Sequence, residues 1–464
     1  MINNLYVFAI GGTGARVLRS LTMLLASGVK MNAKRIVPII IDPDEGCGNT
    51  SDTVGIMNLY QNIHSTLTHT GSIEAFNTEL LKLPFPNDYV LPMCGNIKTS
   101  FEKYIDYAGM SRENKALMNM LFSEENLQTQ MDEGFLGNPN IGSVVLNQFS
   151  QSTEFGKFAT DFSDKDGIFI ISSIFGGTGA SGFPLLLKNL RTAEGVANAA
   201  TLQNAKIGAV SVMPYFNLDK GIVIDSDTFM QKTKAALSYY EKNMGQLEAL
   251  YYIGDDDRKA QPNAKGGAAQ QNKAHFVELA TALAVFDYAE SWEKLVPQKC
   301  VYKEFGIESQ KSDTITFTDL SKNTYNQIAR RLTEFALASK FMRDALSDST
   351  SQTWYGNYTN VSRGDFDTFT QNYLDWLDEM GQKDRGTTFV PFSLSNTPND
   401  VFGFVQNIGT KRVASLKSNW DLVNDRLNNV SNNSVTQSAN NEEGRFTAHV
   451  MLAMKKLVNE KINL

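Results

Sequence analysis

One pentapeptide, Gly-Gly-Thr-Gly-Ala, occurs twice in this chain, and each copy directly follows an apolar segment. The copies are residues 11–15, after the apolar residues 5–10, and residues 176–180, after the apolar residues 168–175. Apolar residues at helical spacing follow both copies, which predicts strand, glycine-rich turn and helix in that order. Glycine lets the backbone approach an oxyanion closely, and the N–H groups at a helix start stabilise negative charge. A single loop of this kind also serves as a simple tight turn, so it is the repetition that favours a nucleotide held by two opposed loops.

Composition excludes several classes of protein. Of the 464 residues 42% are hydrophobic and 20% are charged, as in a soluble globular protein of two or three domains. A net charge of −7 argues against a protein built to bind nucleic acid. The sequence shows no signal peptide and no segment long enough to span a membrane, so we expect a cytoplasmic protein without a membrane span.

Cysteine and histidine give no sign of a metal site. The three cysteines, Cys47, Cys94 and Cys300, are widely scattered and are typical of free thiols in a reducing compartment. The four histidines do not form a ligand cluster either, since the closest two are five residues apart in a polar stretch. We therefore expect no metal ion held by protein side chains alone.

Strand and helix patterns alternate along the first half of the chain, which predicts an α/β fold with a parallel sheet. The expected strands are 5–10, 35–41, 167–175, 206–213 and 250–253, and the expected helices are 14–27, 226–247 and 272–295. The polar stretch 44–130 is interpreted as an insertion with helices near 72–82, 100–108 and 111–122.

The second half predicts a smaller α+β domain. Its expected elements are a strand at 314–318, helices at 323–347 and 365–380, and a strand at 388–394. The Asn- and Ser-rich residues 431–443 are typical of a flexible linker, and a helix at 445–461 ends the chain. The predicted division is 1–295 for the nucleotide-binding domain with its central helix, 296–430 for the second domain and 431–464 for linker and terminal helix.

The order of these segments resembles the tubulin/FtsZ superfamily. The first loop, Gly-Gly-Thr-Gly-Ala-Arg at 11–16, is similar to the glycine loop that opens its nucleotide domain, and residues 175–181 are similar to its signature loop. Residues 134–139, Gly-Phe-Leu-Gly-Asn-Pro, resemble the loop that faces the terminal phosphate. Residues 210–216 and 253–256 resemble the strand ends that lead to the ribose and base, and the helix from Asn272 resembles the central helix.

This resemblance implies a parallel-sheet, Rossmann-like GTPase domain of tubulin/FtsZ type, a long central helix and then a smaller α+β domain. It also implies GTP or GDP with Mg²⁺ as cofactors, and head-to-tail self-association with nucleotide at the subunit interface. Such contacts, when they do not close into a ring, make filaments. The nucleotide-binding residues that it implies are Gly11, Gly12, Thr13, Gly14, Arg16, Asp42, Gly134, Gly137, Asn138, Gly176, Gly177, Thr178, Gly179, Ala180, Ser181, Asp255, Asn272 and Phe276.

Several of these residues have alternative roles. Asp42 ends a strand at the ligand side of the sheet, where it would touch the ribose or hold Mg²⁺ through water, or would simply form a turn before Pro43. Arg16 would place a cation near the phosphates or lie exposed on its helix. Asp255 and Asn272 are the base-reading candidates, with Phe276 as a stacking face.

The resemblance also implies candidate residues for nucleotide hydrolysis. Polymerising members of the superfamily carry acidic residues after the central helix that act on the next subunit's nucleotide. Asp287 and Glu290 are the corresponding candidates here, with the solvated side of a helix as their alternative role. The terminal helix is either a docking peptide for a partner protein or packed on its own domain.

Two other classes of function stay open. A Rossmann-type NAD(P)-dependent oxidoreductase would use the first loop and Asp42, but it leaves the second Gly-Gly-Thr-Gly-Ala unexplained. An interaction module that keeps the fold without a nucleotide is the third interpretation. Phe175 and Ser181 favour it, since both depart from the superfamily's signature.

Overall fold

The first domain is built on one parallel sheet of seven strands. The structure, a computed structural model, describes residues 1–44, 46–69, 73–131, 134–135, 137–218, 226–256, 258–261, 267, 272–305, 313–395, 401–411 and 419–464. The strand order is β3-β2-β1-β4-β5-β7-β9, and every neighbouring pair is parallel. The strands are β1 (Ile2–Ile10), β2 (Ala33–Ile41), β3 (Glu79–Leu80), β4 (Gly167–Ser173), β5 (Ile207–Val212), β7 (Ala249–Ile253) and β9 (Val301–Phe305).

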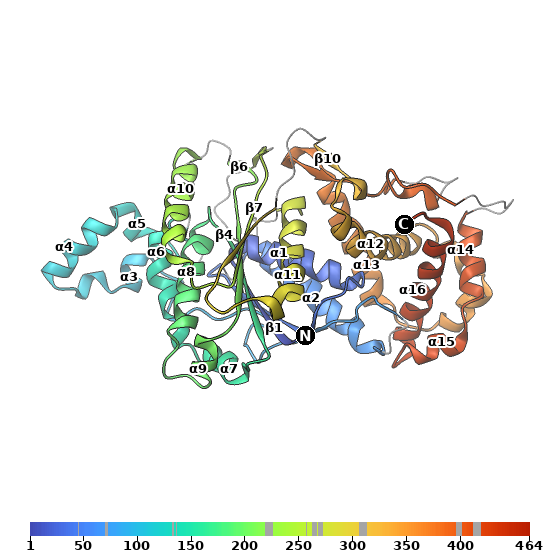
Figure 1. Cartoon of the computed structure of the whole chain (residues 1–464), viewed down its shortest axis with the longest axis horizontal. Coiled ribbons are helices and arrows are strands. Elements are labelled where there is room, and N and C mark those ends of the chain that lie inside the picture. Colours follow the sequence, from blue (N-terminus) through green and yellow to red (C-terminus); the bar gives the residue numbers. More distant parts are fainter. Residues whose placement is uncertain are drawn as a thin grey trace.

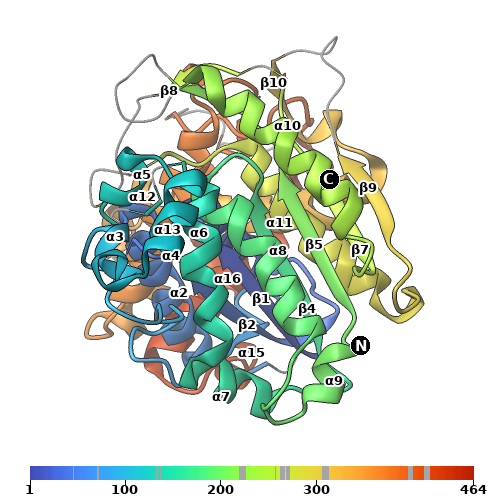
Figure 2. The same ribbon diagram turned by 90° about the vertical axis from the view of Figure 1, so that its left-hand side faces the viewer.

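Helices cover both faces of this sheet, so its central strands are buried and almost wholly apolar. One face carries α1 (Gly11–Ala26), α2 (Gly48–Thr66) and α11 (Phe276–Ser291). The opposite face carries α6 (Pro139–Val145), α8 (Gly177–Arg191) and α10 (Ser226–Asn243), as Figure 2 shows. The shorter helices α7 (Thr153–Asp161) and α9 (Ala199–Gln203) lie near the lower end of the sheet in Figure 1. This doubly wound arrangement confirms the predicted α/β class.

The stretch 44–130 differs from its prediction in two places. Its first third is α2, which packs on α1 as part of the core and is not an insertion. No helix occupies 73–82 in the part of the chain that the structure describes, because Glu79 and Leu80 pair with β2 as the edge strand β3. Only α3 (Phe101–Tyr104), α4 (Arg112–Leu121) and α5 (Glu124–Gln128) form an added unit, the helical arm at the far left of Figure 1.

The second domain lies on the α1 and α2 side of the sheet (Figure 1). Its helices are α12 (Lys322–Asp344), α13 (Gly364–Met380), α14 (Asn419–Asn428), α15 (Asn432–Gln437) and α16 (Glu442–Lys461). Strands β10 (Thr314–Ile315) and β11 (Thr388–Phe389) form a short parallel pair, and β6 (Asn217–Leu218) pairs with β8 (Ala260–Gln261). The predicted boundary at residue 295 is wrong, because β9 continues the first domain's sheet beyond it.

The C-terminal segment is folded onto the second domain. Residues 431–443, predicted to be a flexible linker, contain α15, and Ser438 there is fully buried and accepts a backbone hydrogen bond from Thr68 at 3.1 Å. Helix α16 packs against α12 and α14 and buries residues such as Phe446 and Met454 completely. The docking-peptide interpretation is therefore wrong for this helix, and its alternative, packing on its own domain, holds.

Direct contacts join the two domains along α1. The indole N–H of Trp376 donates to Ser20 Oγ at 3.2 Å, and Ser27 Oγ donates to the Tyr373 hydroxyl at 3.0 Å. Arg19 makes two hydrogen bonds to the Glu379 carboxylate, at 2.8 and 3.3 Å. Among the described residues, no helix has the length and apolar character needed to cross a membrane.

Candidate nucleotide site

The first glycine loop is a tight strand-to-helix junction at the end of β1. Gly11 has φ of +71°, which an L side chain rarely adopts, and α1 begins at this residue. A Cβ atom added to Gly14 would lie 2.7 Å from the carbonyl carbon of Ala9, so only glycine allows this helix to pack so closely on its strand. Gly12 differs, since an added Cβ would meet nothing nearer than Asn49 Nδ2 at 3.6 Å. A Cβ added at Gly12 would therefore make only ordinary van der Waals contacts, so this position tolerates a small side chain.

The second loop repeats this construction at the end of β4. Helix α8 begins at Gly177, and a Cβ added to Gly179 would lie 2.5 Å from the carbonyl oxygen of Ser173. Neither α1 nor α8 has a side-chain cap from its N-cap residue, Ile10 or Gly176. The N–H groups at the start of an uncapped helix are suited to an anion. Ser181 was expected to face the nucleotide, but it is buried and its hydroxyl donates to the Gly177 carbonyl at 2.7 Å.

The structure brings three of the predicted loops together. A Cβ on Gly11 would lie 3.4 Å from Cβ of Thr178, so the two glycine loops touch. A Cβ on Gly177 would lie 3.1 Å from the backbone nitrogen of Asn138 and 3.2 Å from that of Gly137. Gly134 (φ +79°) and Gly137 (φ +72°) supply the turns of this third loop, in which Leu136 lies outside the described residues.

A cation that the sequence did not single out also lies at this junction. Lys232, on α10, donates through Nζ to the carbonyl oxygen of Gly137 at 2.8 Å. Lys232 is far from all three loops in the sequence, so this contact could not be predicted from neighbouring residues. The ammonium group adds positive charge beside the two helix starts, so an anion bound there would be further stabilised.

Asp42 lies at the carboxyl end of β2, as predicted, and is only 5% exposed. Burial raises its pKa to about 7, although hydrogen bonds from the Asp44 N–H and the Thr50 hydroxyl oppose the increase. The described residues contain no group of three His, Cys, Asp or Glu side chains that could hold a metal ion. Mg²⁺ usually takes one or two carboxylates and relies on phosphate and water for its other ligands. Asp42 fits that pattern, because it is a buried carboxylate that follows Ile41, the partner of Ile10 in the sheet.

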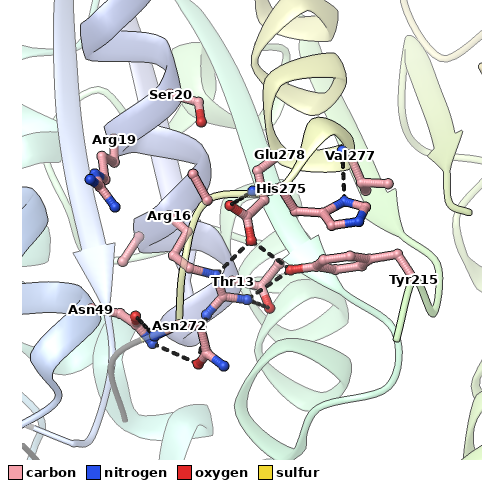
Figure 3. Close-up of polar contacts among 12 residues, drawn as sticks. Thr13, Arg16, Arg19, Ser20, Asn49, Tyr215, Asn272, His275, Val277 and Glu278 are labelled. Carbon is pink, nitrogen blue, oxygen red and sulfur yellow. Dashed lines mark hydrogen bonds and ion pairs between the residues drawn. The ribbon is translucent and has the colours of Figure 1, made fainter. Parts of the chain in front are cut away.

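Arg16 is not exposed on its helix, so one of its two predicted roles is wrong, and its guanidinium lies beside the first glycine loop. Its side chain is 6% exposed, and its Nε donates to Glu278 Oε1 at 2.6 Å. Its Nη2 donates to the Tyr215 hydroxyl at 2.8 Å and to Thr13 Oγ1 at 3.3 Å, and Tyr215 donates to the same oxygen of Glu278 at 2.7 Å (Figure 3). Most of its donors are thus used inside the protein, in a network that joins α1 to the head of α11.

The head of α11 is held by a capping box. The backbone N–H of Val277 donates to His275 Nδ1 at 3.1 Å, and the His275 N–H donates to Glu278 Oε2 at the same distance. Burial, helped by the nearby Arg385 charge, lowers the pKa of His275 to about 4, so this imidazole is neutral. Burial alone would raise the pKa of Glu278, but the charges and hydrogen bonds around it, Arg16 foremost, bring that pKa below its usual value.

The predicted base-reading residues surround this head. Asn272 accepts from Asn49 Nδ2 at 3.2 Å and donates its backbone N–H to Asn49 Oδ1 at 2.8 Å. Asp255 accepts from the Thr387 N–H and hydroxyl of the second domain, at 3.3 and 3.0 Å. Phe276 is buried with its ring 5.3 Å from that of Phe389 of the second domain, and it also lines a cavity.

A cavity of about 420 Å³ opens beside these residues, beyond the carboxyl ends of β5 and β7. Its walls are mostly apolar and come from α10 and α11, with Asp255, Asp256, Arg258 and Lys234 as polar groups. The glycine loops follow β1 and β4, the next strands of the sheet. Phosphate-binding loops and an apolar cavity thus lie along one edge of the sheet, the usual ligand edge of a doubly wound fold.

The two predicted catalytic acids lie near the other end of α11. Asp287 accepts from the Tyr251 hydroxyl at 2.6 Å and pairs with Lys303, and Glu290 is exposed. Both line a second cavity of about 740 Å³, between α11 and α12. Asp287 and Glu290 follow Phe276, the first residue of α11, by 11 and 14 residues, which places them roughly 16 and 21 Å along the helix from its head.

No protein-family model and no curated protein matches this chain. Among solved structures it is similar to CetZ2 from Haloferax volcanii, a GTPγS-bound protofilament, with 12% identity, a TM-score of 0.32 and 62% of this chain and 59% of that chain covered. CetZ from Methanosaeta thermophila gives 14% identity, a TM-score of 0.28 and coverage of 63% and 54%. The empty FtsZ dimer from M. jannaschii gives 18% identity, a TM-score of 0.25 and coverage of 55% and 46%. The matches thus span about half to three fifths of these neighbours' length. CetZ and FtsZ are members of the tubulin/FtsZ superfamily, which is the family that the glycine loops of this sequence resemble.

Proposed function

We propose that this protein binds a nucleotide, GTP or GDP with Mg²⁺, across its two glycine loops. The main support for the proposal is that α1 and α8, neither of which has a side-chain N-cap, begin next to each other. Gly11 at the start of α1 lies against Thr178 at the start of α8. Two helix N-termini and the nearby Lys232 offer positive potential at one point, which suits a polyphosphate better than a single carboxylate. Asp42 would assist Mg²⁺, and the cavity beside Asp255 is large enough for a purine base.

The sharpest test replaces Gly12 by valine. An added Cβ there makes ordinary van der Waals contacts, none nearer than 3.6 Å, and the backbone is not in the left-handed region, so the variant should keep its fold. Its extra methyl groups would crowd the first turn of α1, where we propose that the phosphates bind. The matched control is Gly55→Val, at an exposed position of α2 where an added Cβ has no neighbour within 4 Å. Equilibrium dialysis with GTP and with ATP should show binding that Gly12→Val abolishes and Gly55→Val preserves. Wild-type protein that binds neither nucleotide would refute the proposal.

Self-association is the second part of the proposal. The glycine loops and Asp287 lie toward opposite ends of α11, so head-to-tail stacking would bring Asp287 and Glu290 of one chain toward the nucleotide of the next. We propose that this arrangement gives filaments or open oligomers, with GTP hydrolysis by water that these acids position. Sedimentation at high protein concentration tests it. No pellet or larger species with GTP would contradict the filament, while nucleotide binding itself would stand.

An NAD(P)-dependent oxidoreductase is the second candidate function, because β3-β2-β1-β4-β5-β7 is also the strand order of dinucleotide-binding folds. It uses only the loop after β1 and gives the loop after β4 no role. Chromatography of the ligand released by denaturation separates the two. A nicotinamide dinucleotide would move the assignment to this class, and a guanine nucleotide would exclude it.

A further inference from the structure

One buried cation near the proposed site has no use in the contacts described so far. Arg385, in the one-turn 3₁₀ helix Lys383–Arg385 of the second domain, is 3% exposed. Its Nε and Nη1 atoms are both buried and have no hydrogen-bond partner among the residues that the structure describes. Arginine donors buried in this way are costly to leave unsatisfied, so their retention calls for an acceptor.

The turn that carries Arg385 is clamped onto the first domain. Its carbonyl oxygen lies 3.2 Å from His275 Nε2, and two residues later Thr387 makes both of its hydrogen bonds to Asp255. These contacts fix the backbone at Arg385 and just after it against the head of α11 and the segment that follows β7. Since the side chain is also 3% exposed, the guanidinium is not a surface group.

The charge of Arg385 acts at the same point as the Arg16 network. It adds to the effect of burial that lowers the pKa of His275, opposes the burial that raises the pKa of Tyr215 to about 12, and contributes to the low pKa of Glu278. The guanidinium therefore lies within electrostatic reach of all three. The Glu278 carboxylate does not fill the gap, because its oxygens accept from Arg16, Tyr215 and the His275 N–H. The hydrogen bonds of Glu278 thus go to other residues, and the Nε and Nη1 donors of Arg385 are left without an acceptor among the described residues.

We propose that Arg385 is a nucleotide-binding residue supplied by the second domain, and that its free donors bind a phosphate group of the nucleotide held by the glycine loops. This inference rests on the proposed function and deepens it. The planar guanidinium with parallel N–H groups matches phosphate oxygens in a bidentate manner. The nucleotide would then contact both domains at once, although all of its other proposed contacts come from the first.

The test is the affinity of full-length Arg385→Gln for GTP and for guanosine, measured by calorimetric titration against wild type. We expect GTP binding to weaken by at least tenfold and guanosine binding to change by less than twofold, because only GTP carries phosphate. Lys383→Gln is the matched control, since it removes an exposed cation from the same turn and should leave both affinities unchanged. Arg385→Lys keeps the charge without the planar fork and should give an intermediate loss for GTP. It also keeps the test decisive if the glutamine variant fails to fold.

Each other outcome overturns the inference in a distinct way. An equal loss for GTP and guanosine would mean that the guanidinium contacts the nucleoside or only maintains the fold. Unchanged GTP affinity in folded Arg385→Gln would remove Arg385 from the site while leaving the proposed function intact. Inorganic pyrophosphate that binds wild type as tightly as GTP would indicate a site for free polyphosphate. Wild-type protein without any nucleotide affinity would defeat the proposed function, and this inference with it.

Discussion

The contacts of the buried ion pair between Arg16 and Glu278 predict that substituting either residue lowers the free energy of unfolding. They also predict which of the two substitutions costs more. Glutamine at 278 keeps the shape of the side chain but leaves two buried cations, Arg16 and Arg385, without their anion. Removing one partner of a buried pair costs about 3–5 kcal/mol, and we expect Glu278→Gln to lie in that range. Arg16→Met should cost less, because Glu278 keeps the Tyr215 hydroxyl and the nearby Arg385 charge.

Urea unfolding at pH 7, followed by tryptophan fluorescence and by circular dichroism, measures these changes in the free energy of unfolding. The double variant should cost less than the sum of the single ones, by about 1–3 kcal/mol, because the two side chains touch. Arg35→Met is the control, since the Arg35–Glu79 pair is about half exposed and such pairs contribute roughly 0–1 kcal/mol. A larger loss for Arg16→Met than for Glu278→Gln, or losses below about 1 kcal/mol for both, would refute this account of the network.

The same pair has a defined pH dependence. The pKa of Glu278 in the folded protein is below the ordinary value of 4.5. A carboxylate with a depressed pKa stabilises the fold above its unfolded pKa, and this stabilisation is lost as the pH falls through the folded pKa. The difference in stability between wild type and Glu278→Gln should therefore be constant near neutral pH and shrink below pH 4.5.

Three further predictions concern single side chains. Burial raises the pKa of Asp42 from 3.8 to about 7, so wild type should lose stability as the pH rises from 5 to 8, by up to about 3 kcal/mol; urea titrations should show this loss absent in Asp42→Asn, and equal pH dependence would contradict it. Gly14→Ala should destabilise by about 1–3 kcal/mol, because its Cβ would lie 2.7 Å from Ala9, and Gly12→Ala should melt close to wild type; two equal melting temperatures would count against this packing. Asp287→Asn should slow GTP turnover only at protein concentrations that allow assembly, without changing GTP affinity; slowing at every concentration would place the residue in its own chain's site.

The fold was largely predictable because its core strands are continuous apolar runs. Each glycine loop also marks a strand end and a helix start within a few residues, so local sequence was sufficient there. Helix α2 was missed because its sequence is polar and weakly periodic, and its helical state depends on packing against α1. The residues 431–443 were misjudged because Asn and Ser, which are typical of linkers, here begin helices, as Asn441 does by capping α16.

The candidate site likewise has features that local sequence predicts and features that only the folded chain brings together. The positions of the glycine loops and of Asp42 at strand ends were predicted correctly, because they depend on neighbours in the sequence. The network around Arg16 was not found, because Tyr215 and Glu278 lie 199 and 262 residues away from it along the chain. Arg385 likewise gives no local signal, since only the folded backbone brings its turn to the head of α11.

Helix α1 couples the first glycine loop to the second domain. It begins at that loop, and it also forms part of the interface with the second domain. Fourteen of its 16 residues are buried, and Arg19 and Ser20 on the helix, together with Ser27 just after it, form hydrogen bonds with α13. A close-packed helix of this kind moves as a rigid rod, since its neighbours leave it no room to bend. Any shift of its first turn toward a ligand would be passed to the second domain at full amplitude, without a hinge to absorb it.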